Sequence, residues 1–206
     1  MKRLTWLFPG ILIACVPVQA RAQIAWDSPM LLPPNVQPGV GIYIIDVEGG
    51  DVGAFLDWRS PGWNFGVRVG VADGGRGDDI GIFGGIDMNG PLARETADFP
   101  LEIDWVFGAG IGLDDGARIS IPLGLSVGHR FQNENATFLP YATPRVVLDA
   151  FLGDDDRPRD EDDDDNDLRF EVALDLGLDL RVTQNFLIRF GATVGDRDGV
   201  ALGLVF

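Results

Sequence analysis

The stretch LRFEVALDLGLDLRV, residues 168–182, decides the fold class. Its even positions hold only Leu, Phe or Val, and its odd positions hold Arg, Glu, Asp, Ala or Gly. Successive side chains of a β-strand leave opposite faces, whereas a helix would spread these residues around its circumference. At about 3.3 Å per residue the stretch spans about 50 Å, longer than most strands of soluble proteins. We interpret it as a long strand with one apolar and one ionic face.

The same alternation recurs along the chain, with turn signals between the stretches. Together these stretches predict ten strands, at 40–47, 52–59, 63–72, 79–88, 101–113, 117–131, 138–152, 168–182, 186–195 and 199–206. Proline cannot donate to a sheet ladder, so Pro122, Pro140 and Pro144 weaken the sixth and seventh strands. The first strand alternates poorly, and the sequence leaves open whether Tyr43 or Ile44 faces inward. If the first or second strand is mispredicted, an eight-stranded arrangement follows.

Alternation alone fits both a soluble two-sheet sandwich and a closed barrel. The predicted strands are long, and their polar faces carry glycine and both signs of charge, which suits the crowded interior of a small barrel. Lysine, common on soluble surfaces, occurs only at Lys2. No apolar run beyond residue 22 is long enough for a transmembrane helix, and a membrane protein without such helices is a closed barrel. We therefore predict an all-β chain folded as a closed antiparallel up-and-down transmembrane β-barrel.

The N-terminal residues have the features of a secretory signal peptide. A basic start is followed by an apolar run over 4–18 and by Ala20-Arg21-Ala22, which predicts cleavage before Gln23. In the alternative, Leu12-Ile13-Ala14-Cys15 resembles the lipobox of bacterial lipoproteins, and Cys15 is lipidated. Cys15 is the only cysteine, so neither interpretation gives a disulfide. The predicted organisation is a signal peptide at 1–22, an irregular Pro-rich lead-in at 23–38, and a barrel at 39–206 with an acidic loop at 153–167.

The last residues, GVALGLVF, place Val200, Leu202, Leu204 and Phe206 on one face, with an aromatic residue last. This pattern resembles the C-terminal recognition strand of small bacterial outer-membrane β-barrels, the class of the OmpA-, OmpX- and OmpW-like barrels. The resemblance covers nearly the whole chain after the signal peptide. It implies export, insertion by the outer-membrane barrel assembly machinery, and contact with outer-membrane lipid and lipopolysaccharide. No particular protein of the class is indicated.

Connection lengths give a topology, because such barrels have short periplasmic turns and longer outer loops. Counting back from Phe206 places the acidic run outside and the short TQN connection at 183–185 inside. One long connection, at 91–100, falls inside and departs from the pattern. Aromatic residues near the predicted inner turns match the aromatic belts found at lipid boundaries; they are Trp58, Trp63, Phe131 and Phe138.

Charged residues recur on the faces predicted to point inward. They are Asp57, Arg59, Arg68, Glu102, Asp104, Arg118, Arg130, Arg145, Asp149, Arg169, Glu171, Asp175, Asp179, Arg181 and Arg189. An unpaired charge inside the barrel would be costly, so one interpretation is a paired network that fills the lumen. The other is a polar path for small solutes. Small barrels are mostly filled by side chains, which favours the first.

The sharpest local feature is the run DDDRPRDEDDDDNDL at 154–168, with ten acids between 154 and 167. Blocks of like charge repel one another and usually stay solvated. A second hypothesis is weak divalent-cation binding, of Ca²⁺ or Mg²⁺, because flexible carboxylate loops supply oxygen ligands. The candidate ligands are Asp160, Asp162, Asp163, Asp164 and Asp165. The spacing does not match the EF-hand pattern.

Catalysis finds little support in the sequence. His129 is the only histidine, and by strand parity Ser126 points to the opposite face. No His/Cys cluster offers a zinc site, and no cysteine nucleophile survives processing. The glycine-rich stretch at 108–112 lies within a predicted strand rather than before a helix. We therefore do not expect an enzyme, and we expect no cofactor beyond a weakly bound divalent ion.

The formal charge is −16, and residues 1–22 carry three basic residues and no acids, so the remainder carries −19. Such a chain repels nucleic acid. The sequence predicts a monomeric outer-membrane barrel with a structural or surface-interaction role, or with limited passive solute passage. The alternative is a secreted or lipid-anchored soluble β-protein that binds Ca²⁺ through its acidic loop.

Overall fold

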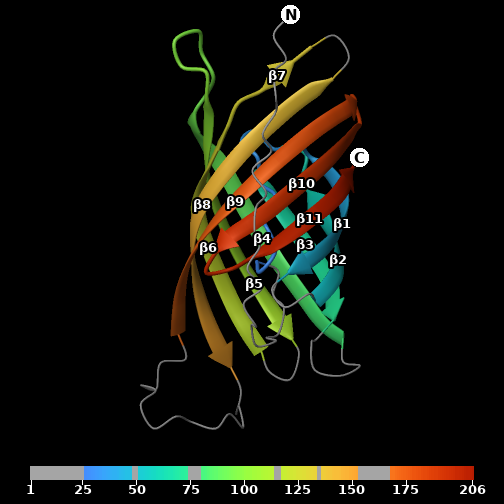
Figure 1. Cartoon of the computed structure of the whole chain (residues 1–206), viewed down its shortest axis with the longest axis vertical. Helices are drawn as coiled ribbons and strands as arrows, with labels where there is room; N and C mark the ends of the chain where they lie inside the picture. The colour runs from blue at the N-terminus through green and yellow to red at the C-terminus, as the bar shows by residue number, and fades with distance from the viewer. Residues whose placement is uncertain (1–25, 48–50, 74–79, 114–116, 134–135, 153–167) are drawn as a thin grey trace, which may run out of the picture.

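The structure is a computed structural model, and it describes residues 26–47, 51–73, 80–113, 117–133, 136–152 and 168–206. Over these residues the regular structure is entirely strand. The strands follow one another as antiparallel neighbours around a ring, in the order β6-β5-β4-β3-β2-β1-β11-β10-β9-β8, and a β6–β8 pairing closes it. Ten strands thus form the wall of a closed barrel (Figure 1), as the alternation predicted, and the eight-stranded alternative is wrong.

The wall strands and one short extra strand have the following bounds: β1 Gly39–Val47, β2 Asp51–Arg59, β3 Phe65–Asp73, β4 Ile80–Ala93, β5 Glu102–Leu113, β6 Ala117–Gly128, β7 Phe131–Gln132, β8 Thr137–Leu152, β9 Leu168–Thr183, β10 Phe186–Gly195 and β11 Gly199–Val205. The short strand β7 pairs only with β8. The predicted bounds of β10 agree with the structure, and most of the others differ by one residue.

The two ends of the barrel carry different connections. The acidic end is where strands are joined through 48–50, 74–79, 114–116, 153–167 and 196–198. The terminal end holds Phe206 and the connections 60–64, 94–101, 129–136 and 184–185. In Figure 1 the ends of β8 and β9 that lead into 153–167 point away from the C terminus. The strand ends Leu152 and Leu168 and the C terminus therefore lie at opposite ends of the barrel, as the topology count predicted, and the acidic run itself lies outside the described residues.

The opening stretch shows how the wall is oriented. In β9 the side chains of Leu168, Phe170 and Val172 are exposed on the outside of the ring, while Asp175 is 1% exposed and faces the lumen. The first strand, which the sequence left undecided, places Tyr43 inside at 1% exposure and Ile44 outside at 60%. The barrel is therefore apolar outside and ionic inside. A sandwich would have buried the leucines against a second sheet.

Three prolines interrupt the ladders around β6 and β8 without breaking the barrel. The β5–β6 ladder skips the pair that Pro122 would make with Gly108, and the β6–β8 ladder skips the pair opposite Pro144. The β6–β8 ladder ends one pair before Pro140, because proline has no N–H to donate to β6. Val147 and the other paired residues keep one register throughout.

The sixth strand, predicted at 117–131, is therefore divided into β6 and β7. His129 and Arg130 lie between them, although the His129 N–H still donates to the Pro140 carbonyl at 3.3 Å. Two further bounds were wrong. β3 begins at Phe65 rather than at residue 63, and β4 continues to Ala93 through an irregularity at Pro91, which shortens the following connection.

Aromatic rings fill the lumen where glycines line the wall. The Tyr43 ring lies over Gly41 and Gly203 and stacks on Phe55 with 4.6 Å between ring centroids. A Cβ added to Gly203 would overlap that ring. The Tyr43 ring lies close to the wall backbone at these two positions. Only glycine, which has no Cβ, allows this close approach.

We predict that Gly203→Val lowers the free energy of unfolding by about 1–3 kcal/mol, the usual range for overpacking. The control is Gly84→Val, because a Cβ there would meet no atom closer than 3.7 Å. Urea unfolding in detergent micelles, followed by tryptophan fluorescence, measures the difference. Equal destabilisation by the two substitutions would contradict this account of the inner wall.

Candidate functional site: a lumen filled by the N-terminal segment

The lumen is occupied by the chain that precedes β1. We call residues 26–38 the plug segment. Trp26 and Met30 are 0% exposed, and Leu31 and Leu32 are almost as deeply buried. The segment forms no regular strand. Its first residues contact side chains of the acidic end, and its later ones contact the terminal end.

The plug segment therefore crosses the lumen lengthwise. Fully extended, the residues from Trp26 to Asn35 would reach at most about 33–36 Å. The apolar band of a membrane barrel is about 25 Å tall. The segment is thus long enough to fill a lumen of that height while remaining partly bent.

Arginines of the wall satisfy the carbonyls of the plug segment. Arg145 donates to the carbonyl of Trp26 at 2.8 Å, and Arg68 donates to that of Met30 at 2.5 Å. Arg189 donates to the Leu31 carbonyl at 3.0 Å. Buried carbonyls require such partners, and an irregular segment cannot supply them from its own backbone.

Carboxylates of the wall accept from the N–H groups of the plug segment. The Met30 N–H donates to Asp175 at 2.9 Å, and the Asn35 N–H donates to Asp104 at 3.0 Å. Few such acceptors are needed, because proline has no N–H and the segment contains Pro29, Pro33, Pro34 and Pro38. A Pro-rich chain and an arginine-rich wall thus complement each other, since arginine carries five donors and no acceptor.

Several wall arginines divide their donors between a carboxylate and the plug. Arg145 holds Asp175 with Nε at 3.1 Å, and its Nη atoms face the carbonyls of the plug. Arg189 holds Asp179 with Nε and Nη2 at 2.6 and 2.7 Å, and its Nη1 reaches the plug. A lysine ammonium could not bridge in this planar fork geometry. Each of these two arginines is therefore held by a wall carboxylate and also binds the plug.

A charge cluster closes the acidic end of the lumen. Arg197 lies in the connection between β10 and β11. It forms ion pairs with Glu171 at 2.6 Å, with Asp149, and with Asp27 of the plug at 2.9 Å. Arg118 pairs with the same Asp27. Burial lowers the pKa of Arg197, but attraction to Asp27, Asp149 and Glu171 outweighs burial, so the pKa stands above its ordinary value.

The apolar side chains of the plug segment fit gaps in the wall. The Trp26 ring packs where a Cβ on Gly108 would lie only 2.9 Å from it, beside the ladder interruption at Pro122. The Arg68 guanidinium lies 4.2 Å from the Trp26 ring and 4.8 Å from the Phe55 ring, as in cation–π contacts. Trp26 is therefore held by both apolar and cationic groups.

The backbone of the plug segment is strained at two residues. Leu31 has φ 57° and Asn35 has φ 54°, in the left-handed region that leucine rarely adopts. Such a residue costs on the order of 1–3 kcal/mol and persists only where its surroundings hold it. The Leu31 side chain packs where a Cβ on Gly191 would lie 2.5 Å from it. The wall thus holds Leu31 in this conformation.

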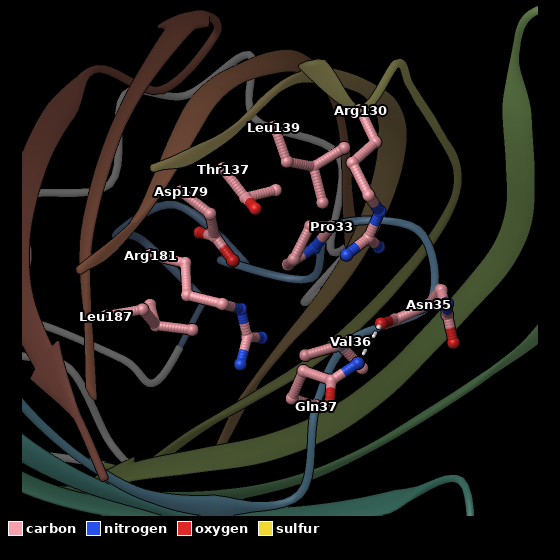
Figure 2. A pocket seen from close by; sticks show the side chains of 10 residues that line it. All are labelled: Pro33, Asn35, Val36, Gln37, Arg130, Thr137, Leu139, Asp179, Arg181 and Leu187. Atoms are coloured by element: carbon pink, nitrogen blue, oxygen red, sulfur yellow. Dashed lines mark hydrogen bonds between the residues drawn. The ribbon is translucent and has the colours of Figure 1, made fainter. Parts of the chain in front are cut away.

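Near the terminal end, described residues of the plug and the wall line a small space (Figure 2). Pro33, Val36 and Gln37 of the plug face Asp179 and Arg181 of the wall there. Only about 10 Å³ is open to the centre of a water-sized molecule, which is room for about one water.

The structure buries most of the residues predicted for the network, whereas Arg130 lies in the connection between β6 and β7 and the Arg169 side chain is 41% exposed. Those almost fully buried are Asp57, Arg59, Arg68, Asp104, Arg118, Arg145, Glu171, Asp175 and Arg189. Arg130 and Arg181 are half-buried near the terminal end. Asp57 and Arg68 face each other across the β2–β3 ladder. The C-terminal residues Val200, Leu202, Leu204 and Phe206 are exposed on the outer face.

The five candidate ligands between Asp160 and Asp165 lie outside the described residues. Within the described ranges, no group of three or more His, Cys, Asp or Glu side chains could hold a metal ion. Over the same ranges, no helix is long and apolar enough to cross a membrane.

Comparisons with known proteins identify no family. No family model matches the chain, and no curated protein matches it. One similar solved structure comes from work on the de novo design of transmembrane β-barrels. It is 12% identical, the similarity covers 84% of this chain and 98% of that chain, and the TM-score is 0.34. A similarity at this level carries no functional conclusion.

Sequence reasoning missed the plug and some of its partners. It treated 23–38 as a lead-in, because the segment has no periodicity. It also omitted Asp87, which pairs with Arg59, and Arg197, which lies in a connection. One signal was available: an apolar stretch, WDSPMLLPP at 26–34, outside every predicted strand needs a surface to bury it.

We predict that Arg197→Gln destabilises the barrel by about 3–5 kcal/mol at neutral pH, because it removes the buried cation that Asp27, Asp149 and Glu171 share. In the wild type, the pKa of Arg197 is higher in the folded than in the unfolded protein, which stabilises the fold. This stabilisation is complete at pH values below the unfolded-state pKa and is lost only at strongly alkaline pH. It therefore does not make stability depend on pH near neutrality. The variant should therefore be less stable than the wild type throughout the pH range in which Arg197 is charged.

The control is Arg169→Gln. Its side chain is 41% exposed and lies 3.8 Å from the same Glu171. Removing an exposed pair costs about 1 kcal/mol or less. Urea unfolding at several pH values measures both variants. Equal destabilisation by Arg197→Gln and Arg169→Gln would show that the cluster does not act as described.

Proposed function

We propose that the protein is an outer-membrane β-barrel whose wall faces lipid and whose lumen is closed by its own N-terminal segment. The observation that carries this proposal is the outer face. Ile44 at 60% exposure, Val69 at 54% and Phe170 at 65% represent an apolar surface on every wall strand. Soluble monomers rarely expose contiguous apolar patches of more than a few hundred Å².

Aromatic side chains near the terminal end support the same proposal. Trp58 and Trp63 are exposed on the β2 side of the barrel, and Phe131 and Phe138 are exposed on the β8 side. Phe186 and Phe206 lie together with 5.5 Å between ring centroids. Aromatic residues favour the level of lipid headgroups, where one edge of the ring is apolar and the other is wet.

The filled lumen favours a structural or surface-interaction role over passive solute passage. The plug segment and the buried arginines leave space for about one water near the terminal end. The orientation that places the terminal end in the periplasm places the acidic run at the cell surface. In that orientation the run is the part offered to lipopolysaccharide and to surface partners.

A fractionation experiment tests this function against the soluble alternative. The full chain, expressed in a Gram-negative host, should partition with outer membranes, require detergent, and migrate differently on gels before and after boiling. A secreted or lipid-anchored soluble β-protein would stay in solution once released and show no heat-dependent migration. That result would reject the membrane assignment.

We predict that Leu202→Arg impairs membrane insertion by about 2–4 kcal/mol, the cost of arginine at mid-membrane depth on a barrel. Leu202 lies between Ile44 and Phe190 in the middle of the outer face. The control is Val52→Arg. Val52 is also exposed, at 62% against 47% for Leu202, but it lies at the acidic end, opposite Asp46, where the cost should be about 0–1 kcal/mol. Reversible urea unfolding in lipid vesicles compares them. Equal costs would contradict the depth that we assign to Leu202.

The divalent-cation hypothesis for the acidic run is tested separately. If the run binds Ca²⁺, calorimetry should give larger heats with the full chain than with a variant that lacks residues 154–167. The affinity should be weak, because the ligands are spaced without an EF-hand pattern. Equal heats from both proteins would reject the hypothesis and leave a solvated anionic loop.

A further inference from the structure

We infer that the barrel is a latent pore, and that the plug segment is a removable stopper held in the lumen by side-chain contacts. The inference rests on the proposed membrane location. It adds a second activity, passage of small hydrated ions, which the protein acquires when residues 26–38 leave the lumen.

The wall closes without help from the plug segment. Closure depends on the β1–β11 ladder, from Gly41↔Val205 to Val47↔Gly199, and on the β6–β8 ladder. Neither ladder includes a plug residue. Moving the segment out therefore breaks no backbone hydrogen bond of the wall.

The lumen wall carries many charged side chains beside its aromatic rings, so an emptied lumen would take up water at those charges. The side chains that hold the plug, Arg68, Arg145, Asp175 and Arg189, are charged groups that water solvates readily. Most of them keep a partner within the wall: Arg145 keeps Asp175, and Arg189 keeps Asp179. An apolar lumen would instead stay dry and resist opening.

The plug segment is held by contacts that can be released together. Its path into the wall runs through Pro38 and Gly39, and Gly39 has φ 152° with no room for a Cβ beside the Phe206 carbonyl. Departure would relieve the strained backbone at Leu31 and Asn35. The buried apolar side chains and the arginine contacts favour the closed state. The closed state therefore depends on the difference between these opposing contributions, because only noncovalent contacts hold the plug inside the lumen.

The space that the plug vacates is wide enough for hydrated ions. It holds a partly bent chain together with the side chains of Trp26, Met30 and Leu32. Barrels of about eight strands already have interiors that hold side chains or one small ligand, and ten strands give a wider ring. The expected cargo is small inorganic ions rather than large solutes.

The test uses the full chain with the substitutions Trp26→Arg and Met30→Arg. The Trp26 ring lies against Arg68, and the Met30 side chain is fully buried, so each substitution would put a further cation into the closed lumen. Like charges in a buried site repel, so the plug should leave. In planar bilayers of neutral lipid in potassium chloride, the wild type should show no steady conductance, and the double variant should show steady steps. A synthetic peptide with the native sequence 26–38 should reduce those steps, and a scrambled peptide should not.

The matched control is Gln37→Arg with Pro38→Arg, which adds the same charge beside the covalent junction and should stay closed. Plug position is read separately with Ser28→Cys, since Ser28 is 1% exposed. A membrane-impermeant maleimide should leave the introduced cysteine unmodified in the otherwise native chain and label it in the double variant. If the double variant gives no heat-modifiable band, Met30→Arg alone replaces it in the same measurements.

Three results would overturn the inference. They are steady conductance in the wild type, a labelled and folded variant without conductance, and a folded variant in which the cysteine introduced at position 28 stays protected, because that plug would not be removable. Loss of heat-modifiable migration and membrane partition by the wild type itself would instead reject the proposed membrane location. The two failures are therefore distinguishable.

Discussion

The guanidinium groups of the inner face are the constraint on which the rest of the structure depends. Alternation places most of the charged residues of the wall on the inner face, beside small and aromatic ones, so closure of the ring collects the charges in one enclosed volume. Buried charges must be paired and their donors satisfied. Wall carboxylates satisfy one side of Arg145 and Arg189, and the other side requires carbonyl oxygens. The plug segment supplies those carbonyls.

This requirement explains why the plug segment has its particular composition. A regular strand in the lumen would bring N–H groups that the arginines cannot accept from, whereas a Pro-rich chain brings carbonyls with few N–H groups. Wall glycines make the remaining room, for Trp26 at Gly108 and for Leu31 at Gly191. The lumen wall thus supplies hydrogen-bond donors and the plug supplies acceptors, so each satisfies polar groups of the other.

How much the sequence predicts depends on periodicity. The strand at 168–182 was predicted within one residue, because fifteen alternating positions leave little freedom. The interruptions at Pro122, Pro140 and Pro144 follow a local rule, although the sequence does not show which neighbouring strand loses the bond. The path of 26–38 follows no period. Its position depends on contacts with residues as distant as Arg197, which only the closed ring brings together.

In the proposed membrane location, lipid covers the apolar side of the wall strands while the ionic side is enclosed. A nitroxide scan along β9 in lipid bilayers tests this arrangement most directly. Single cysteines can be placed there one at a time, since Cys15 is the only native cysteine. Labels at even positions, such as Leu174 and Leu176, should be accessible to oxygen but not to a water-soluble nickel complex, and labels at odd positions should be shielded from both. Even positions shielded from both reagents, with odd positions open to nickel, would contradict the arrangement and indicate two sheets packed face to face in water.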